Sequence, residues 1–211
     1  HPAPVVDVHP DRPDQRGTRL PDGSFVLLPT EPTLDELAAS GATVDAHATD
    51  HLIGDGMFLV SGEIERVTAY ESGLAGHHTF RFGAASDGGD VVEADPLIMD
   101  ERFLAAEVHG RGVSVLSACS HAGVVNACLG AAARFSAAPV DVVLGGYHLA
   151  GGPVEQRIAA TVDDLDARIG PRVVAPGHCT GWRAKAALAA RFAPDRFGPS
   201  AVGTTYLLAA E

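Results

Sequence analysis

The chain has few cationic residues, few cysteines and no long apolar run, and each of these features argues against a class of protein. Lysine and arginine number 15 against 27 aspartates and glutamates, so the formal net charge is -12. A surface with this excess of negative charge repels phosphate backbones, which argues against nucleic acid as a ligand. No apolar run approaches the roughly 18 residues that a membrane-spanning helix needs, so we expect no membrane association.

The cysteine count is odd, at three, and two of the cysteines, Cys119 and Cys179, stand close to histidines. This usage suits a reducing compartment better than a disulfide framework, so we predict a cytoplasmic protein. Hydrophobic residues make up 46% of the 211 residues, which is typical of a globular chain. This length allows one large domain or two small ones with a sizeable core.

The first half of the chain predicts short strands separated by turns and one short helix. The helix is expected over residues 33–40, where Thr33 is the N-cap and Glu36 completes a capping box. Residues 71–90 are rich in glycine, serine and histidine with weak periodicity, so we expect a long loop there. The strands expected in this half cover residues 4–9, 24–28 and 57–60.

The second half repeats one pattern three times: an apolar strand, a turn with glycine and histidine, and a helix. A histidine falls in the turn after each of three strands: His121, His148 and His178. The strands expected here cover residues 103–108, 113–118, 140–144, 172–175 and 202–208, and the first two form a hairpin. The expected helices cover residues 124–134, 154–169 and 182–192.

These three histidines are expected to converge, because the carboxyl ends of neighbouring strands in one sheet lie at the same edge. Imidazoles that converge beside glycines suit Zn²⁺ or Fe²⁺. A single histidine in a turn is more often a surface or hydrogen-bonding residue, but recurrence at three equivalent places favours a metal site. A binding domain whose turns hold an anion through backbone N–H groups stays open.

Three motifs stand in this order along the chain: Leu116–Asn126 (Leu-Ser-Ala-Cys-Ser-His-Ala-Gly-Val-Val-Asn), Gly145–Leu149 (Gly-Gly-Tyr-His-Leu) and Pro176–Gly181 (Pro-Gly-His-Cys-Thr-Gly). Together they resemble the motifs of the metallo-β-lactamase superfamily. They particularly resemble the branch that includes dihydropterin-ribofuranosylaminobenzene phosphate synthase of methanopterin biosynthesis. The segments His9–Asp11, Gly62–Ile64 and Asp100–Glu101 also match the pattern of this branch.

The resemblance implies an α/β fold, an αββα sandwich with metal at one edge, in a single domain over residues 1–211. His121 and His178 match metal motifs of the family, and His148 stands where the superfamily often has a bridging aspartate. We therefore predict these three as ligands of a divalent metal, zinc in the first place, with iron or manganese as alternatives. The resemblance assigns no catalytic acid or base. The residues predicted to support the ligands or contact the substrate are Cys119, Asn126, Cys179 and Asp100.

The main signature of the superfamily, His-x-His-x-Asp-His after an early strand, is absent from the sequence. The nearest segment, His47–His51, has Ala46 and Ala48 where that motif has histidine. The chain also begins with histidine instead of methionine, so we expect a truncated chain whose first strands and first metal motif lay upstream. Exposed strand edges would then favour a homo-oligomer or association with the upstream segment.

The implied function is that of a metal-dependent hydrolase or transferase acting on a small molecule. A bound divalent ion would lower the pKa of a water molecule to about 7, and the expected reaction is attack of hydroxide on an ester, amide or phosphoryl group. The alternative is a non-catalytic binding module that is inactive without the absent motif. A thiol enzyme based on Cys119 and His121 is disfavoured, because side chains two residues apart across a turn rarely point at one atom.

Overall fold

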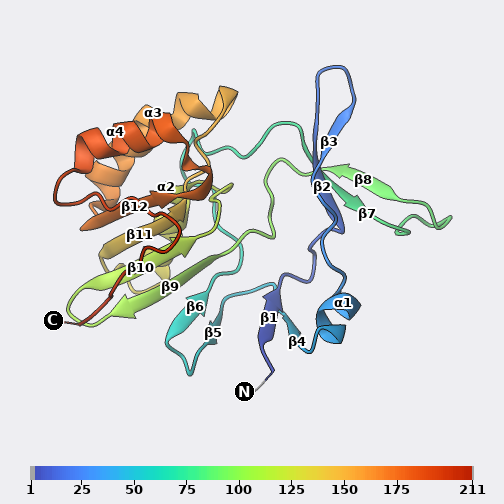
Figure 1. Cartoon of the computed structure of the whole chain (residues 1–211), viewed down its shortest axis with the longest axis horizontal. Coiled ribbons are helices and arrows are strands. Elements are labelled where there is room, and N and C mark those ends of the chain that lie inside the picture. The colour runs from blue at the N-terminus through green and yellow to red at the C-terminus, as the bar shows by residue number, and fades with distance from the viewer. Residues whose placement is uncertain (1–2, 211) are drawn as a thin grey trace. The chain divides into compact units, whose positions relative to one another are not determined.

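The computed structural model describes residues 3–210, which form two compact units (Figure 1). The first unit runs to Thr49 and includes Gly73–Asp100, and the second comprises Asp50–Ser72 and the chain from Glu101 onward. No helix in the described part of the chain is long and apolar enough to cross a membrane. The single domain predicted over residues 1–211 stays a prediction, because a compact unit is not by itself a domain that folds alone.

The first unit consists of short strands and one helix. Strand β1 (Val5–Val8) pairs in parallel with β4 (Thr43–Ala46). A separate antiparallel sheet has the order β3-β2-β7-β8. Its strands are β2 (Gln15–Arg19), β3 (Phe25–Leu27), β7 (His77–Arg81) and β8 (Val91–Ala94).

Helix α1 (Leu34–Ala39) confirms the helix predicted from its capping box. The Thr33 side chain accepts a hydrogen bond from the Glu36 N–H at 3.1 Å, and the Glu36 carboxylate accepts one from the Thr33 N–H at 2.8 Å. Two backbone donors at the start of the helix are thereby satisfied reciprocally, which is why so short a helix begins at a defined residue.

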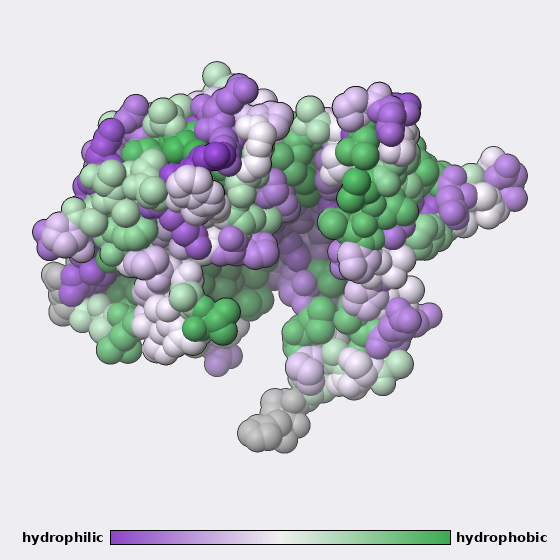
Figure 2. All heavy atoms as spheres, turned by 45° about the horizontal axis from the view of Figure 1, so that its top comes forward, coloured by the Kyte–Doolittle hydropathy of each residue, from purple (hydrophilic) through white to green (hydrophobic). Residues whose placement is uncertain are grey.

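The edge strand β3 carries apolar side chains that face solvent. Val26 and Leu27 of β3 and Leu28, which follows the strand, are about half exposed. Figure 2 shows apolar surface on this unit. Apolar surface of this kind is common where proteins associate, so it is compatible with the predicted self-association, which stays a prediction.

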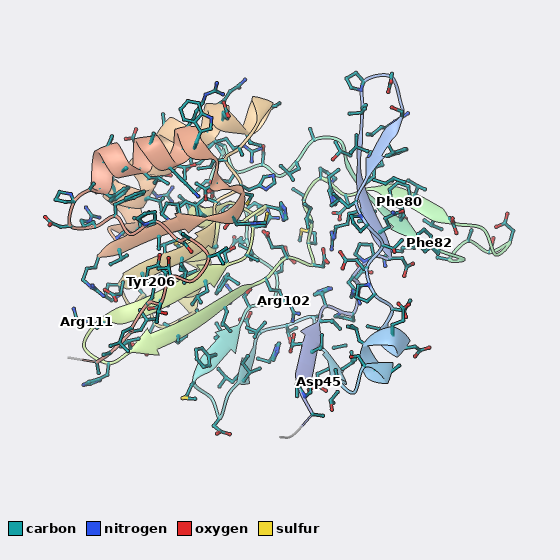
Figure 3. All side chains as sticks on the ribbon, viewed as in Figure 1. Asp45, Phe80, Phe82, Arg102, Arg111 and Tyr206 are labelled. Carbon is teal, nitrogen blue, oxygen red and sulfur yellow. The ribbon has the colours of Figure 1, made fainter. Side chains whose placement is uncertain are left out.

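Two predictions from the sequence about secondary structure are wrong. Strand β7 lies within residues 71–90, where the sequence predicted a loop. It forms because β2 and β8 pair with it on both sides and supply hydrogen bonds that local composition does not encode. Its Phe80 packs edge-to-face on Phe25, with ring centroids 5.3 Å apart (Figure 3). The strand expected over residues 202–208 is absent, and the Tyr206 hydroxyl there donates to the Gly198 carbonyl at 2.9 Å.

The second unit contains a mixed sheet of six strands in the order β12-β11-β10-β9-β6-β5. Strands β10, β11 and β12 are parallel, and the other neighbours are antiparallel. The predicted hairpin is confirmed, and Arg111 lies in its turn (Figure 3). The strands are β5 (His51–Ile53), β6 (Phe58–Val60), β9 (Phe103–Val108), β10 (Gly112–Ser117), β11 (Val140–Gly146) and β12 (Val173–Gly177).

Three helices cover this sheet. Helix α2 packs on β10 and β11, α4 packs on β12, and α3 packs against both α2 and α4. The helix predicted over residues 154–169 is divided into a 3₁₀ turn at Gly152–Arg157, α3 and a π turn at Leu165–Ile169. The helices are α2 (Val124–Arg134), α3 (Ile158–Asp164) and α4 (Trp182–Phe192).

The core of the second unit lies between the sheet and these helices. Val113 and Val115 of β10 meet Ala127 of α2 and Leu188 of α4 in one buried cluster. The helices α2 and α3 are the crossovers of two successive parallel strand pairs, which places the carboxyl ends of β10, β11 and β12 at one edge of the sheet. The predicted α/β class is confirmed.

Candidate metal centre

The turns that carry His121, His148 and His178 follow β10, β11 and β12 directly. Because these strands are parallel neighbours, the turns lie at one edge of the sheet (Figure 1). Three non-glycine residues in the turns have left-handed backbone angles: Ser120 with φ +57°, His148 with φ +44° and His178 with φ +41°. Such conformations cost about 1–3 kcal/mol each and cluster at functional sites. This edge of the sheet is therefore a candidate functional site.

Two glycines at the end of β11 allow the turns on either side to approach. A Cβ atom on Gly145 would lie 1.8 Å from the Ser117 carbonyl oxygen, at a φ of +135°. A Cβ atom on Gly146 would lie 2.5 Å from the Ala118 carbonyl oxygen and 2.8 Å from the Cys179 sulfur. Any larger residue would therefore separate the turns that follow β10 and β12.

Cys119, His148 and Cys179 converge at this edge. One ligand atom of each lies within 4.8 Å of the others. The Cys119 and Cys179 sulfurs are 3.0 Å apart, and the Cys119 sulfur is 3.4 Å from His148 Nδ1. All three side chains are partly exposed, so solvent and small solutes can reach them.

This donor set fits a zinc ion. Zinc binds thiolate sulfur at about 2.3 Å and imidazole nitrogen at about 2.0–2.1 Å, which in tetrahedral geometry separates two sulfurs by about 3.8 Å and sulfur from nitrogen by about 3.6 Å. The separations of 3.0 and 3.4 Å therefore reach zinc geometry with sulfur movements below about 1 Å. Two sulfurs and one nitrogen leave a fourth tetrahedral position for a water or a substrate group.

The two thiols differ in their ionisation. The hydrogen bond between the two sulfurs lowers the pKa of the Cys179 thiol to about 4, and contacts with His148 act in the same direction, while burial opposes the shift. The same hydrogen bond, together with burial, raises the pKa of Cys119. A thiolate is the form that binds metal, so the lowered pKa of Cys179 favours metal binding at this edge.

His121 lies beside this group and is held by Glu101. Its ring packs edge-to-face on His148, with centroids 4.6 Å apart, and its Nδ1 lies 2.9 Å from the Glu101 carboxylate. That carboxylate also accepts the backbone N–H groups of His121 at 2.8 Å and Ala122 at 2.6 Å. Burial raises the pKa of Glu101, but these hydrogen bonds and the imidazole outweigh it, so the pKa lies below its ordinary value of 4.5.

Glu101→Gln is expected to lower the free energy of unfolding at pH 7 by about 1–3 kcal/mol, because Gln has one acceptor oxygen where the carboxylate has two. The pKa of Glu101 is lower in the folded chain, so its stabilising effect is present above the unfolded pKa of about 4.5 and is lost as the pH falls through the folded pKa. Urea titrations in steps from pH 7 to about pH 3 should show the difference shrinking in acid. A difference that does not change with pH would contradict the assignment, and Glu107→Gln, on an exposed position of β9, is the control.

The other predicted site residues, His178, Asn126 and Asp100, lie outside this group. His178 is exposed, next to Cys179 in the chain, and neither His121 nor His178 belongs to the group of Cys119, His148 and Cys179 that converges at this edge. Asn126 is buried, and its side chain accepts the N–H groups of Val67 and Thr68 at 3.0 Å each. Asp100 belongs to the first unit, where it forms an ion pair with Arg16.

Glu101 was not among the predicted site residues, although it stands next to Asp100 in a segment that matches the family pattern. The signal was present in the sequence, because a carboxylate is a common partner of a site histidine, but nothing local distinguishes Glu101 from its neighbour. Only the pairing of β9 with β10, which sets Phe103 opposite Ser117, brings Glu101 next to the turn that holds His121.

Comparison with known proteins finds similarity by sequence and by structure, and no family model matches the chain. The chain is similar to the 7,8-dihydropterin-6-methyl-4-(β-D-ribofuranosyl)-aminobenzene-5′-phosphate synthase of Methanocaldococcus jannaschii, at 33% identity over 98 residues. This match covers 46% of the chain and 32% of that protein, so the matched part spans about a third of the relative's length.

Among solved structures, the chain is similar to Tm1679, a metal-dependent hydrolase of the β-lactamase superfamily. The TM-score is 0.74, and the likeness covers 97% of this chain and 71% of that chain. Sequence identity is 20%, so the likeness establishes a common fold, while the reaction has to be argued from the side chains at the edge of the sheet.

Proposed function

We propose that this chain, which has the fold of the metallo-β-lactamase superfamily, binds a divalent metal and acts in metal-dependent hydrolysis or group transfer. The observation that carries the proposal is the convergence of Cys119, His148 and Cys179 at the carboxyl edge of three parallel strands. The description of Tm1679 as a metal-dependent hydrolase supports it, since that protein shares the fold.

The ligands in this proposal are Cys119, His148 and Cys179, with His121 and His178 as the further ligands that the sequence motifs predict. Thiolate and imidazole donors favour zinc over manganese, which prefers oxygen ligands, and iron remains the alternative. His121 is close enough to act with this group, because its ring contacts that of His148. His178 is exposed and follows β12 immediately, so it is a candidate for the open side of the site.

A divalent ion held by these residues would supply a Lewis acid and lower the pKa of a bound water. The protein itself contributes His121, and its neighbour Glu101 determines which ring nitrogen of His121 carries the proton. Because the Glu101 carboxylate lies 2.9 Å from His121 Nδ1, it accepts a hydrogen bond from that nitrogen, and Nε2 keeps its lone pair in the neutral ring. That lone pair serves one role only: His121 either binds the ion at Nε2, or it accepts a proton there, in which case Glu101 stabilises the imidazolium that forms.

A small molecule is the proposed substrate. The pterin-phosphate synthase named among the relatives supports a substrate with a phosphoryl or ester group. The net charge of -12 argues against a polyanionic ligand, so a compact molecule that binds through the metal edge is favoured over a nucleic acid.

Cobalt titration tests the proposal directly, because thiolate ligands produce charge-transfer absorption that oxygen and nitrogen ligands do not. The reduced chain is expected to bind one equivalent of Co²⁺, and zinc is expected to displace it. His148→Ala should weaken binding about a hundred-fold, since one ligand of a zinc site accounts for roughly 3 kcal/mol. His109→Ala is the control, because His109 is exposed in the turn between β9 and β10.

The same assay decides the roles of His121 and His178, whose alanine variants lose affinity if these residues are ligands.

A panel of chromogenic carboxylate esters and phosphate esters then tests for turnover that stops when a chelator is added. Metal binding without turnover would favour the non-catalytic alternative. No thiolate-to-cobalt absorption in the wild-type chain would contradict the proposed site.

A further inference from the structure

We propose that Cys119 and Cys179 form a reversible disulfide, and that this disulfide and a bound metal ion exclude each other. The two sulfurs are 3.0 Å apart although the residues are 60 positions apart in the chain. The metal part of this inference rests on the proposed function, whereas the formation of the disulfide depends only on the thiols.

The separation of the sulfurs lies between two stable arrangements. A disulfide bond is about 2.05 Å long. Two thiolates that share a tetrahedral zinc ion are about 3.8 Å apart. From 3.0 Å, the sulfurs move together by about 1 Å to form the bond, or apart by less than about 1 Å to hold the ion. Both arrangements use the same two sulfur atoms, so they cannot exist together.

The residues that follow the two cysteines fix both turns to the end of β11. The Ser120 hydroxyl donates to the Gly146 carbonyl at 2.7 Å. The Thr180 hydroxyl accepts the Tyr147 N–H at 3.1 Å and donates to the Gly177 carbonyl at 2.7 Å. Ser120 and Thr180 are both buried, so these bonds are protected from water. The turns therefore hold the two sulfurs next to each other without needing a metal ion.

Exposure distinguishes this pair from the third cysteine. Cys119 and Cys179 are partly exposed, whereas Cys128 of α2 is fully buried in the core. A soluble oxidant can therefore reach the pair but not Cys128, which makes Cys128 an internal control in the same chain.

The oxidant that we name is a small disulfide such as oxidised glutathione. The thiolate of one cysteine attacks a glutathione sulfur, the glutathione S–S bond breaks, and one glutathione leaves as its thiolate. The second cysteine attacks the resulting mixed disulfide, an S–S bond joins Cys119 to Cys179, and the second glutathione leaves with the proton of that thiol. The protein loses two electrons, and oxidised glutathione gains them to become two reduced molecules.

The test incubates the folded chain with oxidised glutathione, once free of metal and once with one equivalent of zinc. Mass spectrometry of the metal-free sample is expected to show the loss of two hydrogen atoms per chain, and peptide mapping to show a Cys119–Cys179 link. Cys128 is expected to remain a free thiol, which is alkylated only after unfolding. Zinc is expected to slow the reaction at least ten-fold, and the oxidised chain to bind zinc only after reduction by dithiothreitol.

Two variants check the order of steps. Cys119→Ser is expected to stop at a mixed disulfide that carries one glutathione on Cys179, since no second thiol is in reach. Cys128→Ala is expected to form the disulfide as the wild type does. Circular dichroism verifies that each variant is folded, so that a failure to form the disulfide can be distinguished from unfolding.

The outcomes separate this inference from the proposed function. Zinc binding without a Cys119–Cys179 link overturns the inference and leaves the proposed function standing. If the chain binds no zinc and the link forms equally fast with and without it, two proposals are overturned: the mutual exclusion of disulfide and metal ion, and the metal site itself. Links between chains, or a link that includes Cys128, also overturn the inference.

Discussion

Gly146→Val is expected to weaken zinc binding by at least about a thousand-fold, because it separates several ligands at once instead of removing one. A Cβ atom at this position would lie 2.5 Å from the Ala118 carbonyl oxygen and 2.8 Å from the Cys179 sulfur. Valine adds two methyl groups beyond that atom. The turns after β10 and β12 must therefore move apart, and Cys119 and Cys179 move with them.

Gly146→Val should lower the free energy of unfolding by less than it weakens the free energy of zinc binding. Overpacking of this kind costs about 1–3 kcal/mol, and the rest of the sheet and its helices stay in place. Isothermal titration with zinc measures the affinity, and urea unfolding measures the stability of the same sample. Zinc affinity within ten-fold of the wild type would show that the ligands do not depend on this close approach.

Gly130→Ala is the matched control for this variant. Gly130 lies within α2, where an added Cβ atom would be 3.2 Å from the flexible end of Arg134 and 3.5 Å from Phe103. Alanine favours a helix over glycine by about 0.5–1 kcal/mol, so the control should be as stable as the wild type or slightly more so. Its zinc affinity should not change.

Glu71→Ala is expected to lower the free energy of unfolding by about 3–5 kcal/mol, which is a large part of the stability of a domain this size. The Glu71 carboxylate is buried, with 2% of its surface exposed, at the start of α2. It accepts the N–H groups of Val125 at 3.0 Å and Asn126 at 2.9 Å, and the Thr68 hydroxyl at 2.9 Å. Alanine leaves these donors buried without an acceptor.

This carboxylate also explains a glycine in the turn. A Cβ atom on Gly123 would lie 2.1 Å from the Glu71 carboxyl carbon, so only glycine lets the carboxylate reach the start of the helix. Burial raises the pKa of Glu71 despite its hydrogen bonds, yet the N-terminal end of a helix favours a negative charge there. The role is structural: Glu71 and Asn126 tie the segment around Thr68 to α2.

Chemical denaturation followed by circular dichroism measures the effect of Glu71→Ala. Glu65→Ala is the control, since Glu65 is exposed in the same segment and its loss should change stability by less than about 0.5 kcal/mol. Equal effects of the two substitutions would show that the buried carboxylate does not hold this segment on the helix.

Local patterns in the sequence predicted most elements of the second unit. Helices α2 and α4 begin and end where their periodicity predicts, and the hairpin of β9 and β10 is confirmed. These elements have strong local signals: apolar spacing of three and four residues, and glycines in the turns. The strand β7 had no such signal, because its histidines and threonine become a strand only through pairing with neighbours on both sides.

The sequence predicted the edge of the sheet at which the three turns lie, but it did not predict the contacts between their side chains. The repeated strand, turn and helix led to the edge at which His121 and His148 pack against each other. The roles of His121, His148 and His178 as ligands stay a prediction that the alanine variants test. Cys119 and Cys179 were predicted as supporting residues, and the structure brings their sulfurs together with His148.

The sequence by itself determined the α/β class, the order of strands and helices from residue 103 to residue 192, and the edge where chemistry is expected, because these depend on local periodicity and on the rules of parallel strand connections. Only the tertiary structure decided which side chains share that edge. Cys119 and Cys179 meet because β11 lies between their strands and ends in two glycines, and Glu101 reaches His121 because β9 pairs with β10. Such contacts depend on register and on side-chain volume across strands, which no pattern within one segment encodes.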